Sequence, residues 1–532
     1  MSNVNYDLII VGAGTAGCVL AERLTRSGKL KVLVVEAGGA PRNRLVSIPA
    51  GFTKLFKSKL DWAFESEPQR AVGGRRIFTP RGKMLGGSSN MNAQIHQWCH
   101  PADFNGWAAL GAAGWGWSDV AGVFRSQEQW LDDDGQDNRG HDGPMLVSPN
   151  HNARPVSLAF VEAARNAGLG DQRQYNGRAF SGAWLCEIAH SQGKRYSVYD
   201  AYLKPAMRRA NLQVATDAQA TRVAIAGGRV AGVVVSRAGT ELNYASNNVV
   251  LAAGAFGSPQ LLFHSGIGPA AQLQRLGIAV QHDAPEVGEN LQDHPVLTIC
   301  FGSRDSDTLK SAESIPNVMR YLLFKRGMLA SNGIEAFAFT QARPGLVPAP
   351  ALELICAPLE YRNQFLEPPK VHAFSIGAAV VAPLSRGRLS FDRANPLAAP
   401  AIDFGLLSDP DGIDASVLCK GVRMAREIAA SAPLSELNTG ELRPGAAAGT
   451  DVQILEYASR EMQTVYHPSS TCRMGSDARA VVDSQLRVRG VDGLWVADAS
   501  VMPCVPRGHP NAVVAMIAQR AADWIEPRVR GF

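Results

Sequence analysis

The segment YDLIIVGAGTAGCVLAERL at residues 6–24 constrains the fold more than any other part of the chain. Its apolar run is typical of a buried strand in a parallel sheet, and the glycine-rich turn leads into a segment with helical periodicity. Gly12, Gly14 and Gly17 match the pattern GxGxxG. These glycines allow a tight turn, the approach of a diphosphate and the packing of helix on strand. The segment predicts the start of a dinucleotide-binding βαβ unit.

A second apolar run, KVLVVEAGG at residues 31–39, contains Glu36 at its end and completes the unit. A carboxylate at this position can accept hydrogen bonds from ribose hydroxyl groups, and the N-terminus of the preceding helix favours the negative charge of a diphosphate. Strand, turn, helix, second strand and terminal acid together predict a bound dinucleotide. They leave open whether it is NAD or FAD.

Another glycine-rich segment, PRGKMLGGSSNMNA at residues 80–93, favours FAD. The long ribityl and isoalloxazine half of FAD needs contacts beyond the first βαβ unit. Gly86 and Gly87 allow close approach of the backbone, and the serine and asparagine side chains that follow offer polar contacts. A colourless NAD-dependent dehydrogenase remains the alternative.

The length of 532 residues predicts about two or three domains. With 46% hydrophobic and 19% charged residues, and with no apolar run long enough to cross a bilayer, the composition is that of a globular protein without an integral membrane segment. The net charge of +5 is small and spread along the chain, so we expect no nucleic-acid partner. We expect a monomer or a small homo-oligomer.

The eight cysteines lie far apart and form no CxxC pair, which argues against a zinc site and a disulfide framework and fits a reducing compartment. The N-terminal MSNVNYD leads directly into the first strand, without the apolar core of a signal peptide. We therefore expect no metal site and a cytoplasmic location.

Motifs spread over nearly the whole chain resemble those of the glucose–methanol–choline (GMC) oxidoreductase family. GKMLGGSSNMNA is similar to the first signature of that family, and GAFGSPQLLFHSGIG at 254–268 matches the second. VGENLQDH at 287–294, HPSSTCRMG at 467–475 and VDGLWVADASVMP at 491–503 are also typical. The resemblance implies an α/β fold, α+β overall, with a Rossmann-like FAD-binding domain and a discontinuous substrate domain built on an antiparallel sheet packed with helices.

In the implied division, the FAD-binding domain consists of residues 1–155, 206–298 and 464–532, and the last of these segments includes the catalytic C-terminal part. The substrate domain consists of residues 156–205 and 299–463. Residue patterns agree with it. Residues 211–237 alternate apolar and polar side chains around a Gly-Gly turn, as hairpin strands do. Residues 411–431 have helical periodicity, with Val417, Leu418 and Val422 on one face.

The resemblance also implies which residues contact FAD. The diphosphate and the adenosine ribose are expected to contact Gly12, Gly14, Thr15, Ala16 and Glu36. The middle of the cofactor and the ring are expected to contact Met84, Gly86, Gly87, Asn90, Asn92 and Ala93. Val223 is expected near the adenine, Asp498 and Ala499 near the diphosphate and ribityl chain, and Asn511 and Ala512 near the pyrimidine side. Some relatives attach FAD through a histidine where this chain has Met91, so we expect non-covalent FAD.

Oxidation of an alcohol to a carbonyl requires removal of the hydroxyl proton and transfer of a hydride to flavin N5. Histidine has the unperturbed pKa that best suits the base. The resemblance assigns His467 as the principal base and His509 as the partner that orients the substrate oxygen. Each precedes a proline, which restricts the local backbone. His294 is expected to be structural.

Three positions, His96, Trp98 and Pro510, are the expected substrate contacts, and the first two depart from the family pattern. A small aromatic or heteroaromatic primary alcohol such as pyridoxine, with O2 as acceptor and H2O2 as product, is the preferred interpretation. The alternative is choline or an aliphatic alcohol with a quinone or dye acceptor, and candidate partners for a cation are Glu335, Glu353 and Glu360. A flavin-containing lyase similar to hydroxynitrile lyase and a non-catalytic flavoprotein stay open.

Overall fold

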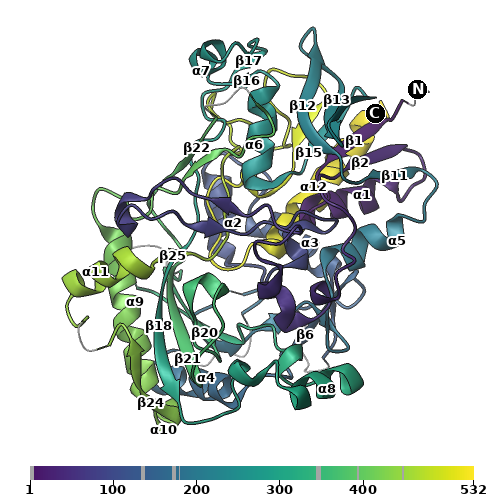
Figure 1. The fold of residues 1–532 in the computed structure, drawn as a ribbon. Helices are drawn as coiled ribbons and strands as arrows, with labels where there is room; N and C mark the ends of the chain where they lie inside the picture. Colours follow the sequence, from purple (N-terminus) through teal and green to yellow (C-terminus); the bar gives the residue numbers. More distant parts are fainter. Residues whose placement is uncertain are drawn as a thin grey trace.

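The computed structural model describes residues 5–132, 138–170, 175–178, 180–342, 349–391, 395–445 and 448–531. Two large sheets organise the chain, a parallel one in the upper part of the molecule and an antiparallel one in the lower part (Figure 1). The chain passes between them repeatedly, so neither sheet is built from one continuous segment. This arrangement confirms the predicted mixed fold class. The exact division of the chain into domains stays a prediction.

The parallel sheet has five strands in the order β11-β2-β1-β15-β26. Their bounds are Leu212–Ala215, Val32–Val35, Leu8–Val11, Val249–Leu251 and Leu494–Val496. All four pairings are parallel, and β1, β2, β15 and β26 are buried along their whole length, which explains their continuous apolar sequences. Helix α1 (Thr15–Thr25) follows the glycine turn and packs against α12 (Asn511–Val529), the last helix of the chain.

The predicted hairpin around Gly227 and Gly228 is present but shorter than expected. β12 (Gln219–Ala226) and β13 (Arg229–Arg237) pair in antiparallel fashion, and β14 (Thr240–Ala245) extends the ribbon. The first part of the predicted hairpin, β11, instead joins the parallel sheet beside β2. Alternation of side chains identifies a strand but not its partner, which explains this correction.

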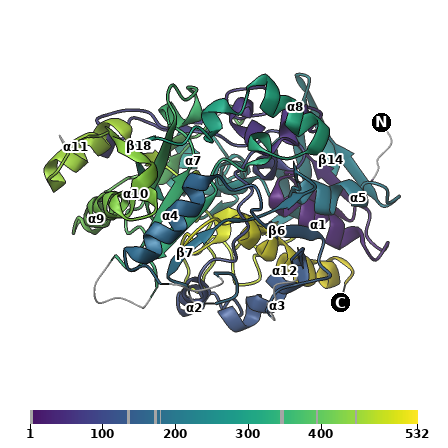
Figure 2. The ribbon, with the colours of Figure 1, turned by 90° about the horizontal axis from the view of Figure 1, so that it is seen from below.

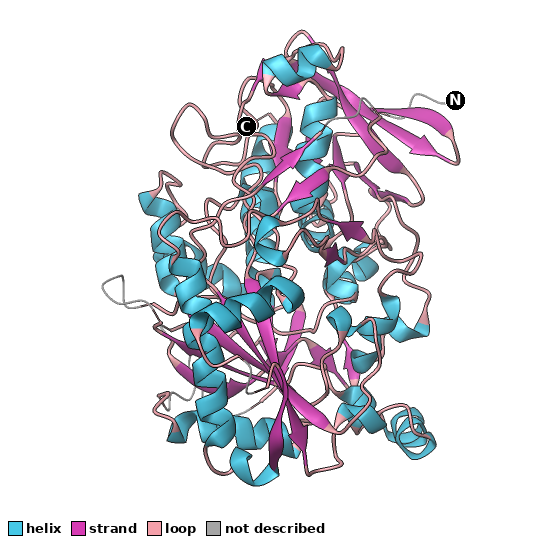
Figure 3. Cartoon of the chain, turned by 60° about the vertical axis from the view of Figure 1, so that its left-hand side comes forward, coloured by secondary structure: helices cyan, strands magenta, loops and turns pink. Residues whose placement is uncertain are grey.

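The antiparallel sheet has seven strands, in the order β24-β18-β21-β20-β19-β7 with β25 beside β18. Their bounds are Asn438–Arg443, Pro295–Ser303, Ala373–Val380, Leu352–Ala357, Ala336–Thr340, Gly182–Leu185 and Gln463–Thr464. Helices α4 (Pro155–Asn166) and α9 (Ile413–Ala430) pack on one face, and Figure 3 shows helices along this side. Val417, Leu418 and Val422 of α9 are buried there, as predicted. Because side chains alternate along a strand, the other face is left for a pocket.

The other helices of the described residues are α2 (Pro101–Ala109), α3 (Trp117–Gln127), α5 (Lys204–Ala206), α6 (Gly254–His264), α7 (Ala270–Arg275), α8 (Ile315–Phe324), α10 (Leu434–Leu437) and α11 (Asp451–Glu461). Short strands are β3 (Phe64–Glu65), β4 (Phe78–Thr79), β5 (Glu128–Trp130), β6 (Met145–Pro149), β8 (Glu187–Ile188), β9 (His190–Ser191), β10 (Lys194–Arg195), β16 (Ile267–Gly268), β17 (His282–Asp283), β22 (Arg388–Ser390) and β23 (Ala401–Asp403). Within the described ranges, none of these helices has the length and apolar character needed to cross a bilayer.

Candidate active site

An elongated cavity begins at the carboxyl ends of β1 and β2. Glu36 lines it and holds the two loops together, because its carboxylate accepts the backbone N–H groups of Ala13 and Gly38, each at 2.8 Å. Burial raises the pKa of the Glu36 carboxyl to about 7. The position of Glu36 at the end of the second parallel strand is the one that sequence predicts for a contact with ribose.

The glycines of the first turn differ in what surrounds them. Gly12 has φ +99°, and a Cβ there would lie 2.5 Å from the carbonyl oxygen of Ala252. A Cβ on Gly17 would lie 1.9 Å from the carbonyl oxygen of Gly12, so Gly17 allows the helix to pack on the turn. A Cβ on Gly14 would meet no protein atom within 4 Å, although Gly14 lines the cavity at the N-terminus of α1. Open space at a helix N-terminus fits a diphosphate.

The second glycine-rich segment closes over the first. Gly87 lies so near Gly14 that a Cβ on Gly87 would be 2.8 Å from the Cα of Gly14. Asn90 donates a hydrogen bond to the carbonyl of Leu85 (2.7 Å) and thereby holds this loop. The Asn92 side-chain oxygen accepts a bond from the buried guanidinium of Arg195, at 2.7 Å.

The expected cofactor residues fall into three groups. Gly12, Gly14, Thr15, Ala16, Glu36, Gly87, Asp498 and Ala499 line the elongated cavity, whereas Asn92, Ala93 and Asn511 line the pocket that adjoins it. The third group lines neither space: Met84, Gly86, Asn90, Val223 and Ala512. The backbone N–H of Val223 donates to Ser265 (2.8 Å), and Ala218, Gln219 and Ala220 line that end of the cavity. Sequence reasoning missed these three residues, because a strand edge beside a cavity has no sequence signal.

Asp498 is both a cavity residue and a cap. It lines the cavity, accepts hydrogen bonds from the backbone N–H of Gly254 (2.8 Å) and the hydroxyl of Ser258 (2.5 Å), and caps a short helical turn through Ser500. Burial raises the pKa of its carboxyl. Asp498 therefore connects the end of β26 to the start of α6.

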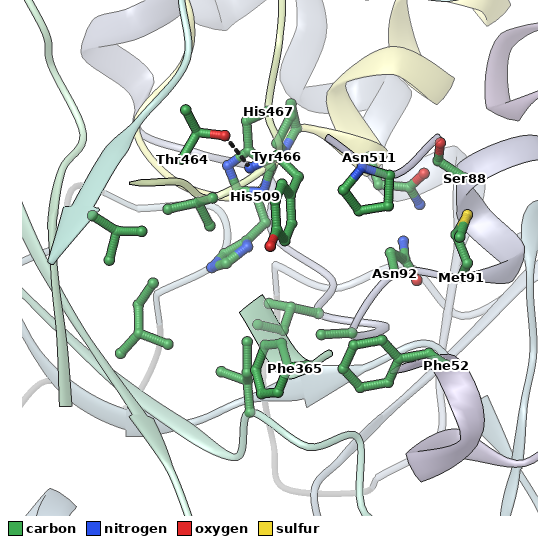
Figure 4. Close-up of a pocket in the computed structure, with 18 of the residues that line it drawn as sticks. Phe52, Ser88, Met91, Asn92, Phe365, Thr464, Tyr466, His467, His509 and Asn511 are labelled. Atoms are coloured by element: carbon green, nitrogen blue, oxygen red, sulfur yellow. Dashed lines mark hydrogen bonds between the residues drawn. The ribbon is translucent and has the colours of Figure 1, made fainter. Parts of the chain in front are cut away.

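A largely apolar pocket lies between this cavity and the free face of the antiparallel sheet (Figure 4). Val296 and Ile355 line it from β18 and β20, and Phe52 and Phe365 lie opposite the two histidines. Thr15, Ser88, Pro468, Ala499 and Val514 line both the pocket and the elongated cavity, so the two spaces adjoin. A dinucleotide in the cavity would therefore present its far end to the pocket.

His467 enters the pocket from the segment after β25. Its backbone N–H donates to Asp293 (2.8 Å), and its Nδ1 lies 3.0 Å from Nδ1 of His294. Burial, together with His509, His294 and Arg81, lowers the pKa of His467 well below its usual range. The imidazole of His467 is therefore neutral near neutral pH, as a base must be.

His294 is fully buried and contacts His467. Burial lowers the pKa of its imidazole to about 3, so it stays neutral. Its contact with His467 leaves Nε2 of His467 as the nitrogen free to face a substrate. The contact between His294 and His467 could not be predicted from sequence, because the two residues are far apart in the chain.

His509 lies at the start of α12, with its ring centroid 5.0 Å from that of His467. Its Nε2 lies 2.9 Å from a carboxylate oxygen of Glu353, which is fully buried on β20. Its backbone N–H donates to the side chain of Gln97 (3.0 Å). Sequence reasoning considered Glu353 only as a partner for a substrate cation and missed its contact with His509. A single carboxylate within the apolar strand LELICA was the available signal.

Arg81 was also missed. It lines both the pocket and the elongated cavity, and it donates to the carbonyl of Tyr466 at 2.5 Å. Tyr466 has φ +66°, an unusual conformation for a residue other than glycine, which such contacts hold in place next to His467. Burial lowers the pKa of Arg81, and Asp293 opposes this shift.

Two of the three expected substrate contacts lie elsewhere. His96 forms a buried pair with Glu128 (3.2 Å), which also binds Arg139, and the indole of Trp98 donates to His96 (3.2 Å). No member of this cluster lines the pocket, whereas Pro510 does.

The chain is similar to known proteins over nearly its whole length. A family model described as GMC oxidoreductase matches residues 6–296, and a C-terminal model with the same description matches residues 383–518. An uncharacterised GMC-type oxidoreductase of Mycobacterium tuberculosis is 44% identical over 98% of this chain and 99% of its own. An oxygen-dependent choline dehydrogenase of Photobacterium profundum is 36% identical, over 98% and 93%. The structure of pyridoxine 4-oxidase from Mesorbium loti superposes with a TM-score of 0.89 at 29% identity, covering 98% and 99%.

Proposed function

The chain belongs to the GMC oxidoreductase family, and on that premise we propose that it oxidises a neutral aromatic or heteroaromatic primary alcohol to the aldehyde with His467 as general base. Family membership makes the chain an FAD-dependent oxidoreductase that acts on the CH–OH group of donors, which confirms the enzyme class and the cofactor expected from sequence. The choice among alcohols rests on the pocket.

The observation that supports a neutral substrate is the charge of the pocket lining. Among its described residues there is no carboxylate, whereas Arg81 supplies a partly buried cation. Apolar and aromatic side chains, including Phe52, Phe365 and Ile355, make up much of the rest. A quaternary ammonium group such as that of choline is stabilised by acids and aromatic cages, and Arg81 would repel it.

The three glutamates considered as partners for a cation are engaged elsewhere. Glu335 accepts hydrogen bonds from Ser157 (2.8 Å) and Ser331 (2.5 Å), and Glu360 pairs with Arg443 (2.9 Å) and Arg362 (3.1 Å). Glu353 lies behind His509. These contacts support the neutral alcohol over choline, even though choline dehydrogenases are among the similar proteins.

His467 and His509 have different roles in the proposed oxidation. We assign Nε2 of His467 as the acceptor of the hydroxyl proton. In the tautomer that leaves Nε2 free, His467 donates its Nδ1–H to Nδ1 of the neutral His294, and this hydrogen bond is kept after Nε2 takes the proton. The Glu353 carboxylate holds His509 through Nε2 (2.9 Å), and we assign His509 as the partner that stabilises the developing negative charge on the substrate oxygen. When bound, FAD supplies the acceptor for the hydride that leaves the alcohol carbon.

The cofactor is held without a covalent bond in this proposal, because Met91 faces the pocket where a linking histidine would be needed. Gly12, Gly14, Thr15 and Glu36 hold its diphosphate and ribose half. We further propose O2 as the final acceptor, giving H2O2, in line with the structural similarity to pyridoxine 4-oxidase.

A panel of alcohols under air tests the proposal. Benzyl alcohol or pyridoxine should bleach the bound flavin without oxygen and give one peroxide per turnover in air, with kcat/KM well above that for choline. A preference for choline would overturn the substrate assignment. Turnover only with an added quinone or dye would overturn the acceptor, and substrate consumption without bleaching would indicate a lyase.

A further inference from the structure

Helix α8 (Ile315–Phe324) exposes apolar side chains to solvent. Ile315 is 80% exposed, Leu323 66% and Leu322 56%, and Met319 on the same side is also exposed. Figures 1 and 2 both place α8 at the periphery of the molecule. These four residues follow the spacing i, i+4, i+7, i+8 and so form one face of the helix. An apolar face of this kind on the outside of a protein marks an interaction surface.

The opposite side of α8 attaches it to the protein. Tyr321 is its one buried residue within the described chain, and the Tyr321 hydroxyl donates to the carbonyl of Gly193 (3.0 Å). The apolar face therefore points outward because the helix is anchored through its other side, and not because the helix is loosely held.

Basic residues lie on α8 and on either side of it in the chain. Lys310 precedes the helix, Arg320 lies on it, and Lys325 and Arg326 follow it directly. The nearby acid Glu313 is already paired with Lys54 (2.8 Å). Lys54 belongs to the turn η2 (Pro49–Leu55), and the exposed Lys57 and Lys59 follow it in the chain, Lys57 with Glu65 at 3.6 Å. The surface thus combines an apolar centre with a cationic rim, which is the pattern of helices that lie in a lipid interface.

We propose that α8 docks on the surface of an anionic lipid bilayer, with the apolar face inserted at the headgroup boundary and the cationic rim on the lipid phosphates. Charge decides against a second copy of the chain as the occupant, because two such rims placed face to face would repel. An anionic surface attracts them. Docking of this kind needs no membrane-spanning helix.

Docking would also bring the active-site pocket close to the bilayer. The turn η7 (Met328–Ala330), just after α8, packs against η2, and Phe52 of η2 lines the pocket. An apolar alcohol that partitions into lipid would then be concentrated beside this wall. This consequence rests on the proposed function, whereas docking itself does not.

Flotation of the full-length, FAD-loaded protein with vesicles tests the proposal. The protein should float with vesicles of phosphatidylglycerol and phosphatidylcholine, but not with phosphatidylcholine alone, and roughly 1 M salt should weaken binding because it shortens the Debye length to about 3 Å. The double variants Leu322→Gln/Leu323→Gln and Lys325→Glu/Arg326→Glu should each lower the lipid partition coefficient at least about tenfold.

Leu158→Gln is the matched control, since Leu158 is 53% exposed on α4, and it should float like the wild type. Flavin content and turnover of a water-soluble alcohol should be unchanged in every variant, which separates this proposal from the proposed function. Absence of flotation with anionic vesicles, or equal flotation of the α8 variants, would overturn it. So would an α8-dependent dimer, detected by light scattering, that does not bind vesicles.

Discussion

Replacement of Glu353 by glutamine should slow the chemical step while leaving the fold intact. The Glu353 carboxylate is fully buried and lies 2.9 Å from Nε2 of His509. Glutamine has nearly the same shape but no charge, so it cannot give His509 the same charge-assisted hydrogen bond. A hydrogen bond to a charged group contributes about 1.5–3 kcal/mol. At about 1.4 kcal/mol per factor of ten, its loss should slow flavin reduction by about 10–150-fold.

The assay is anaerobic mixing of the FAD-loaded enzyme with benzyl alcohol or pyridoxine, followed by the loss of visible flavin absorbance. The limiting rate should fall more than the apparent substrate affinity, because the lost contact acts when charge develops on the oxygen. Glu335→Gln is the matched control, since Glu335 is equally buried but bonds to serines instead of His509. A Glu353→Gln enzyme that reduces flavin at the wild-type rate, or a control that loses as much, would refute the reasoning.

Three further predictions concern the cofactor and the base. The variant Gly14→Ala should keep the wild-type Tm but bind less FAD, because the added Cβ clashes with no protein atom yet occupies the cavity. The ratio of flavin absorbance to protein measures the bound FAD, and full FAD occupancy in the variant would contradict the prediction. Acid precipitation should release all the flavin, and a yellow pellet would show a covalent link. Because the neutral imidazole of His467 is the base and its pKa is lowered, kcat/KM should fall only as the pH drops below about 6.5; an apparent pKa above 7 would count against His467.

The parts of the fold that follow local rules could be predicted from sequence. The GxGxxG turn, the strands on either side of it and the position of Glu36 depend on short stretches of backbone geometry, and the structure has them as expected. Strand partners could not be predicted. β11 reads like part of a hairpin yet pairs with β2, because alternation does not encode which neighbour a strand chooses.

The candidate site shows the same division. His467 and His509 could be assigned from motifs, but their supports, His294 and Glu353, come from distant segments and meet them only in the folded chain. His96 illustrates the opposite case. Its departure from the family pattern suggested a substrate contact, yet His96 lies 3.2 Å from Glu128 in a buried cluster.

The most direct test of the account is the rate of flavin reduction in His467→Ala. Mixed with benzyl alcohol or pyridoxine in the absence of oxygen, the wild-type enzyme should lose its visible flavin absorbance. The variant, with the same FAD content, should do so about 10²–10⁴ times more slowly, the usual contribution of a general base. Reduction of the flavin in the variant at the wild-type rate would contradict the assignment of His467 as the base.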